Sequence, residues 1–406
     1  MPCLNVKRIL LQSSQELLAN ADAWNDLWQR SECTWPTMRA EPLAHWIDTF
    51  ASNVPTKILA VEDQGKLVAA LPLIQDRIGP LRIGKLPGGD LCSIGDLLLD
   101  PDLDRANGKS PLIDLVDAIQ TQRWPLIRFD AIFPETRRWQ AFLQVLDARK
   151  MSWIARHRGV TGIIDVRGDW DSYFAARSRN HRRQMRVVHN RALKERNLRL
   201  QLVANPPLAE IEPLLQRGFE VEDRSWKGQG GSSTLRSPGA FAFFVEQAKL
   251  LSQSGHLLLA FLNLDETTIA FEYGWQSKDV YHSLKVGYDE SYQRLSPGQL
   301  LRYLMMEKLF EQGEIAQVDY LGPLSEATGK WATRTYPVSR LLVANGILGK
   351  VLLWAYAKRT ARRSQSAAAT AGVLEKDSIS GKMKVAENPS QFADDDLTEQ
   401  HSLPAK

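Results

Sequence analysis

The stretch that most constrains the fold of this chain covers residues 280–310. Side chains 281–287 alternate in type, which is the period of a half-buried β-strand. The tripeptide Ser-Pro-Gly at 296–298 then breaks the pattern, and apolar residues follow at helical spacing. Ser296 suits an N-cap, and Pro297 suits the first helical position, where its missing N–H costs no hydrogen bond. The stretch therefore predicts a strand, a turn and a helix in direct succession.

A turn of this kind is a candidate anion site. The first helical turn leaves backbone N–H groups without intrahelical partners, and the helix dipole adds positive potential there, so a phosphate or pyrophosphate binds well. Arg294, just ahead of the turn, adds charge. An ordinary strand-to-helix connection with a good cap is the alternative that the residues alone leave open.

Two motifs in the second half of the chain resemble a known family. One is EDRSWKG at 222–228, and the other is KVGYDESYQRLSPGQLL at 285–301. They are similar to the signature of the GNAT-superfamily acyltransferases of the CelD/BcsL type, which are described as cellulose-biosynthesis acetyltransferases. The similarity extends from about Trp24 to about Val343.

The resemblance implies an acyl-CoA co-substrate, above all acetyl-CoA, whose pyrophosphate lies at the turn before the helix. The usual GNAT phosphate loop, R/Q-x-x-G-x-G/A, is present here only in the degenerate form QRLSPGQ. The residues that the resemblance assigns to the cofactor are Arg294, Ser296, Pro297, Gly298, Gln299 and Leu300.

The resemblance also implies an α/β (α+β) fold of tandem GNAT-like domains, similar to the FemABX transferases. Each domain would hold a mixed, mostly antiparallel sheet flanked by helices. The expected divisions are a diverged N-terminal domain at 1–160, an acyltransferase domain at 161–345, an amphipathic helix at 346–363 and a disordered tail at 364–406.

Local patterns supply further elements. Strands at 57–62 and 66–74 around a Gln-Gly turn predict a β-hairpin, and Pro72 suggests that its second strand ends there or lies at an edge. Strands at 256–262 and 267–275 lead into the strand at 280–287 as a three-stranded meander, an order that matches a GNAT core.

Four arginines share one face of a predicted helix. Their spacing of i, i+3, i+4 and i+7 groups Arg179, Arg182, Arg183 and Arg186. Such a face suits an anion: a CoA phosphate, a nucleotide-activated sugar, tRNA, an acidic polymer or a lipid surface. The alternative is a solvated basic face, for which the local sequence supplies Glu195 as a counter-charge. Aromatic residues are not interleaved with the arginines, so stable nucleic-acid binding is not expected.

Acyl transfer needs a group that removes a proton and donors that polarise the thioester carbonyl. Glu222 and Asp289 are the first candidates for the base, with Lys285 beside them in the KVGYD motif. Trp226 and Lys227 precede a Gly/Ser-rich loop and would line the substrate entrance. No Ser-His-Asp or Cys-His signature is recognisable, which agrees with direct transfer.

Composition excludes other classes. The net charge is only +4, and three scattered cysteines give neither a disulfide framework nor metal-ligand spacing, so no metal is expected. The apolar run at residues 9–11 is too short for a signal peptide, and no stretch of about 20 apolar residues occurs, so we expect a soluble cytoplasmic protein without a signal peptide or a transmembrane segment.

The leading hypothesis is an acyl-CoA-dependent N- or O-acyltransferase that acts on a sugar or small precursor of an envelope polysaccharide. The resemblance implies that it is an acetyltransferase. One alternative is a FemABX-like aminoacyl-tRNA-dependent transferase, in which the arginine face contacts RNA. Another is a non-catalytic module that binds an anionic polymer or membrane.

Overall fold

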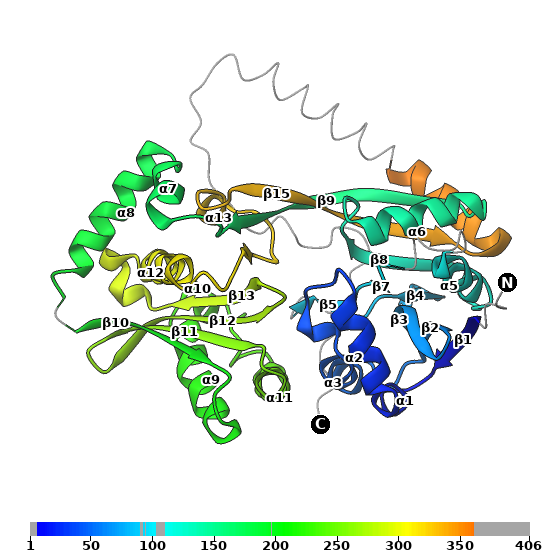
Figure 1. The fold of residues 1–406 in the computed structure, drawn as a ribbon, viewed down its shortest axis with the longest axis horizontal. Coiled ribbons are helices and arrows are strands. Elements are labelled where there is room, and N and C mark those ends of the chain that lie inside the picture. Colours follow the sequence, from blue (N-terminus) through cyan, green and yellow to red (C-terminus); the bar gives the residue numbers. More distant parts are fainter. Residues whose placement is uncertain (1–5, 90–91, 94, 103–109, 196, 361–406) are drawn as a thin grey trace, which may run out of the picture.

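The computed structural model describes residues 6–89, 92–93, 95–102, 110–195 and 197–360. The predicted tail at 364–406 and the last three residues of the predicted helix at 346–363 lie outside the described residues. The fold is mixed α/β, and one mostly antiparallel sheet runs through both halves of the chain (Figure 1). The expected fold class is confirmed.

The sheet follows the order β1-β2-β3-β4-β8-β15-β9-β14-β13-β12-β11-β10, with β7 paired to β3. Its N-terminal strands are β1 (Val6–Leu11), β2 (Thr56–Asp63), β3 (Lys66–Ile78), β4 (Leu81–Lys85), β7 (Leu98–Leu99) and β8 (Leu126–Ile132). The others are β9 (Trp153–Asp165), β10 (Leu198–Ala204), β11 (Leu257–Leu264), β12 (Thr267–Ser277), β13 (Val280–Tyr288), β14 (Gln317–Asp319) and β15 (Arg334–Ala344). Two-residue strands β5 (Gly88–Gly89) and β6 (Cys92–Ser93) pair separately.

Helices of the N-terminal half are α1 (Ser14–Ala19), α2 (Ala21–Arg30), the 3₁₀ turn η1 (Pro36–Met38), α3 (Ala40–Phe50), α5 (Pro111–Gln120) and α6 (Arg137–Ala148). Those of the C-terminal half are α7 (Trp170–Ala175), α8 (Arg179–Ala192), α9 (Leu208–Asp223), α10 (Trp226–Gln229), α11 (Ala240–Gln253), the 3₁₀ segment η2 (Glu290–Leu295), α12 (Pro297–Gln312) and α13 (Glu326–Gly329). A further helix covers 346–360.

Two long strands, β9 and β15, join the halves. They pair with each other from Trp153 to Ile163, while β15 also pairs with β8 and β9 also pairs with β14. Residue 160, the expected domain boundary, therefore lies inside a continuous strand. The strand β9 continues through this position because a bulge opposite Val338 and Ser339 absorbs the irregularity near Gly159.

The C-terminal part of the sheet has two different faces. On β11, Leu257, Leu259 and Phe261 point to one core cluster, while Leu258 and Ala260 point to the other. The first cluster contains α9, α11 and much of the N-terminal half, and the second contains α7, α8 and α12. One face thus packs against the other half of the molecule, and the opposite face carries the helix that follows the Ser-Pro-Gly turn.

The structure also tests the predicted strand pairs and the predicted position of Pro72. The hairpin and the three-stranded meander are confirmed. Pro72, however, neither ends its strand nor lies at the sheet edge, because β3 continues to Ile78. On one side, β3 pairs with β7 at Ala69–Ala70 and with β4 from Ile74 onward. Pro72 lies opposite the gap between these two strands, so it needs no N–H on that side.

The helix at 346–360 docks through Leu353 on the central strands β4, β8 and β15 and exposes Ile347, Val351 and Trp354 on its other side. Of the helices in the described segments, none has the length and apolarity needed to cross a bilayer.

Candidate functional site

The predicted turn between β13 and α12 is present. Ser296 adopts the left-handed conformation (φ 47°, ψ 58°), and its carbonyl accepts the N–H groups of Gln299 and Leu300. Its side chain makes no cap bond, and Pro297 is the first helical residue. A Cβ on Gly298 would stand 3.1 Å from the Tyr288 ring. The start of α12 therefore lies directly against the end of β13, and a glycine is what permits this approach.

The strands β13 and β14 part in front of this turn. They are parallel and pair only over three residues, the last pair being His282 and Asp319, whereas β13 continues to Tyr288. On its other edge β13 has a bulge at Leu284, between the pairs Ser283–Gly274 and Lys285–Tyr273. The six residues of β13 that follow His282, up to Tyr288, span about 20 Å. This is the length scale of an extended phosphopantetheine arm.

The two sequence motifs meet at Glu222, the last turn of α9. Its carboxylate accepts Lys227 Nζ at 2.9 Å and the backbone N–H of Thr234 at 3.0 Å, and Lys285 Nζ lies 3.8 Å away. Lys227 also donates to the Val286 carbonyl at 3.0 Å. Thus WKG and KVGYD are two halves of one buried ionic cluster.

Glycines at two places allow this cluster to close. A Cβ on Gly287 would stand 2.7 Å from Glu222 Cα, and one on Gly228 would stand 1.8 Å from the Asp223 carbonyl oxygen. Only a residue without a side chain lets β13 and the WKG turn approach α9 so closely. The glycines of both motifs therefore serve the packing around Glu222.

Charge fixes the protonation state of Glu222. Burial raises the pKa of its carboxyl group, but Lys227 and Lys285 together with the hydrogen bond from Thr234 outweigh burial and hold that pKa below its ordinary value. The carboxylate is 1% exposed and stays ionised near neutral pH. Such a group stabilises its neighbours well and is a weak base.

Asp289, like Glu222, is a carboxylate that accepts several hydrogen bonds. Its Oδ1 accepts the backbone N–H and the hydroxyl of Ser291, and its Oδ2 accepts Arg224 Nε at 2.6 Å. Burial raises the pKa of Asp289, while the bonds from Ser291 and Arg224 lower it further than burial raises it. Asp289 thus caps η2, the segment that leads to the Ser-Pro-Gly turn.

The remaining predicted cofactor residues differ in surroundings. Arg294 forms an ion pair with Glu195 at 2.6 Å and is largely exposed. Gln299 Oε1 accepts Trp331 Nε1 at 2.9 Å, which ties α12 to the segment before β15, and Leu300 is fully buried in the core.

The predicted arginine face lies on α8, next to this turn. The helix packs through His181, Met185, Val188 and Ala192, and Arg179, Arg183 and Arg186 are exposed on the opposite side. Near its C-terminal end, Arg191 donates to the Arg294 carbonyl at 3.1 Å. Of the predicted entrance residues, Trp226 is 55% exposed, whereas Lys227 points into the Glu222 cluster.

One group of polar residues was missed by sequence reasoning. His282, Asp319 and Tyr336 come together between the two halves, where His282 Nε2 contacts the Thr34 carbonyl at 3.1 Å and Tyr336 donates to Asp319 at 3.0 Å. They belong to three strands far apart in the chain, and each alone looks like an ordinary strand residue. The only available signal was His282, inside the predicted strand that leads to the turn.

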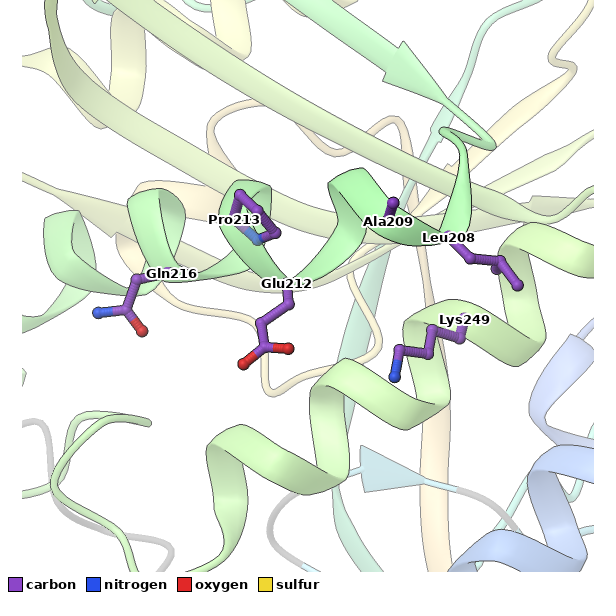
Figure 2. Close-up of a pocket in the computed structure, with 6 residues that line it drawn as sticks. All are labelled: Leu208, Ala209, Glu212, Pro213, Gln216 and Lys249. Atoms are coloured by element: carbon purple, nitrogen blue, oxygen red, sulfur yellow. The ribbon is translucent and has the colours of Figure 1, made fainter.

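A separate groove lies between α9 and α11 (Figure 2). Its volume is about 580 Å³, and it is lined by Leu208, Ala209, Glu212, Pro213, Gln216 and Lys249. None of the predicted site residues belongs to it. Over the described ranges, no group of three His, Cys, Asp or Glu residues is arranged to hold a metal ion.

Comparison with known proteins defines the class. Residues 179–328 match the acetyltransferase (GNAT) domain, and these residues contain β13, the turn, α12 and the Glu222 cluster. No curated protein sequence matches the chain. The part of the chain that carries the candidate site therefore matches a GNAT acetyltransferase domain.

FemX and a protein from Bacteroides thetaiotaomicron share the wider fold, and a third solved structure superposes less closely. FemX superposes with a TM-score of 0.53 at 12% identity, covering 83% of this chain and 96% of that one. A conserved protein of unknown function from Bacteroides thetaiotaomicron gives 0.50 at 11% identity, covering 83% and 100%. A tandem GNAT protein from the clavulanic acid biosynthesis pathway gives 0.44 at 12% identity, covering 84% and 98%.

Proposed function

We propose that this protein is an acyl-CoA-dependent acyltransferase of the CelD/BcsL type that transfers an acyl group, above all acetyl, to a sugar or small precursor of an envelope polysaccharide. The observation that carries the CoA assignment is the pair formed by the turn at 296–298 and the parting of β13 from β14. The acceptor class rests on the resemblance of the two sequence motifs.

In this proposal the pyrophosphate binds at the first turn of α12, where backbone N–H groups and the helix dipole favour an anion. The pantetheine arm then follows β13 toward His282, and the distance of about 20 Å along the strand matches its length scale. Along the edge of β13 that has no partner strand, backbone N–H groups are the proposed donors to the thioester carbonyl. The acceptor attacks the thioester directly.

The ionic cluster around Glu222 supports the proposed CoA site because it contacts β13 at Val286 and Gly287. Glu222, Asp289 and Lys285 were expected to be catalytic, and we propose that Glu222 and Asp289 hold β13 and η2 in place, because each is ionised and fully hydrogen bonded. Trp226, which is exposed, remains a candidate contact for the acceptor.

The test is calorimetric titration with acetyl-CoA on the native protein and on Gly298→Trp. The indole would have to displace Tyr288 and fill the turn, so we expect saturable binding that the substitution weakens at least tenfold. Gly89→Trp is the matched control, because a Cβ at Gly89 meets no atom within 4 Å. Equal affinity in all three proteins would refute the pyrophosphate assignment, and circular dichroism melts would show that each variant is folded.

The exposed arginines of α8 support a second candidate, an aminoacyl-tRNA-dependent transferase. It predicts tRNA retention that falls steeply with salt and weakens in Arg183→Glu, with no affinity for acetyl-CoA.

A further inference from the structure

The helix at 346–360, coloured orange in Figure 1, is held firmly against the sheet by one of its faces. Leu353 is buried among side chains of β4, β8 and β15. A Cβ at Gly349 would overlap the Pro125 carbonyl oxygen, so only a glycine lets the start of the helix lie this close. Near the other end, the Arg156 guanidinium of β9 lies 5.3 Å from the centroid of the Tyr356 ring. The opposite face of the helix therefore points outward in a fixed orientation.

This outward face carries a contiguous stripe of large apolar side chains. Its members are Ile347, Leu348, Val351 and Trp354, which are 84%, 57%, 56% and 59% exposed. Their spacing of i, i+1, i+4 and i+7 places them on one arc of about 120° around the helix. Contiguous apolar surface of this kind on a folded protein marks an interaction site.

The stripe is bordered by positive charge. At about 100° per residue, the exposed Lys350 and Arg359 lie on its two borders, and Lys358 lies at its C-terminal end. Lys358 Nζ is 4.0 Å from the centroid of the Trp354 ring. The sequence from 345 to 374 contains five lysine and arginine residues and no aspartate or glutamate. The charge of this segment is therefore complementary to an anionic partner.

We propose that this helix docks the protein on the surface of a lipid bilayer that contains anionic lipids. The helix lies in the plane of the surface, and the apolar stripe enters the boundary between headgroups and acyl chains. Lys350, Lys358 and Arg359 bind the lipid phosphates, while their aliphatic stems cover the borders of the stripe. The inference goes beyond acyl transfer and does not depend on the acyl-CoA assignment.

The same observations favour lipid over a second copy of the chain. Pairing two copies through this stripe would bring two segments of like charge together, which opposes association. Trp354 next to Lys358 is the combination of side chains typical of the interface between lipid and water.

The other basic helix, α8, differs in its apolar residues. Among the described residues of α8 and its C-terminal cap, the exposed large apolar side chains are Val187 and Leu193. They are six positions apart, so they lie on different sides of the helix. Thus α8 offers charge without a contiguous stripe, and it supplies a matched control.

The first test is flotation of the full chain with vesicles. We expect the native protein to bind vesicles of equal parts phosphatidylglycerol and phosphatidylcholine, and to bind pure phosphatidylcholine about tenfold less or weaker. Leu348→Asp places a charge in the stripe and should weaken binding by about tenfold or more. Leu193→Asp makes the same change at a leucine that is 70% exposed, and it should alter binding less than about twofold. Circular dichroism melts check that both variants are folded.

The second test reads the depth of contact. Vesicles with brominated acyl chains should quench the tryptophan fluorescence of the native protein, and Trp354→Phe should lose most of this quenching. Trp226 is also exposed, so the difference between the two proteins is the quantity that reports on the helix.

Three outcomes would overturn the proposal. The first is no vesicle binding, or binding that Leu193→Asp abolishes and Leu348→Asp leaves intact. The second is binding without bromine quenching at Trp354, which would mean adsorption to headgroups only. The third is self-association that sedimentation detects and Leu348→Asp removes, since a second copy would then cover the stripe. None of these measurements uses acetyl-CoA, so their failure and that of the proposed function are read separately.

Discussion

Two buried carboxylates near the same strand, Glu222 and Asp319, have opposite surroundings. Glu222 touches two lysines and the N–H of Thr234, and its pKa is held low. Asp319 faces a neutral histidine acceptor, and burial raises its pKa to about 6. The comparison teaches that burial of a charge does not by itself mark an active site. Glu222 is surrounded by donors and holds neighbouring elements together, whereas Asp319 accepts Leu321 and Tyr336 and also faces His282 Nδ1, a buried acceptor without a hydrogen-bond partner among the described residues.

The larger effect is expected at Glu222. In Glu222→Gln the two ammonium groups of Lys227 and Lys285 lose their buried partner, which costs about 3–5 kcal/mol of the free energy of unfolding. Urea unfolding at pH 7.5 measures this loss. Glu220→Gln, at an exposed position of the same helix, is the control and should change stability by less than about 0.5 kcal/mol. Similar values for both variants would show that the cluster is not structural.

The same chemical change at Asp319 is expected to have the opposite sign. A carboxyl group whose pKa is raised in the folded state binds its proton more tightly there, so it stabilises below about pH 4 and the advantage is lost as pH rises through 6. Asp319→Asn removes this unfavourable charge and offers His282 Nδ1 a donor. We expect a gain of about 1–3 kcal/mol at pH 8 and no gain at pH 4.

Urea unfolding at both pH values checks this expectation. A loss of stability at pH 8 would mean that Asp319 is as well satisfied as Glu222, and the contrast between the two carboxylates would disappear.

The sequence predicted features built from adjacent residues better than features built from residues far apart in the chain. The turn at 296–298 was predictable because its strand, cap and helix are adjacent in the chain. The roles of Lys227 and Gly287 were not, because the motif similarity indicated importance without showing that both contact Glu222. His282 and Asp319 are separated by the whole of α12, and no local pattern shows that parallel pairing makes them neighbours.

Pairing between distant strands also explains why the strand end predicted at Pro72 was wrong. Pro72 was expected to end its strand or to lie at an edge, yet β3 continues through it because the neighbouring strands β7 and β4 leave a gap at that point.

The most direct measurement of the central claim is a crystal structure with acetyl-CoA bound. We expect the pyrophosphate at the first turn of α12 and the acetyl group between β13 and β14, near the last strand pair His282–Asp319. Acetyl-CoA bound in the groove between α9 and α11, or on the arginines of α8 without reaching β13, would contradict it.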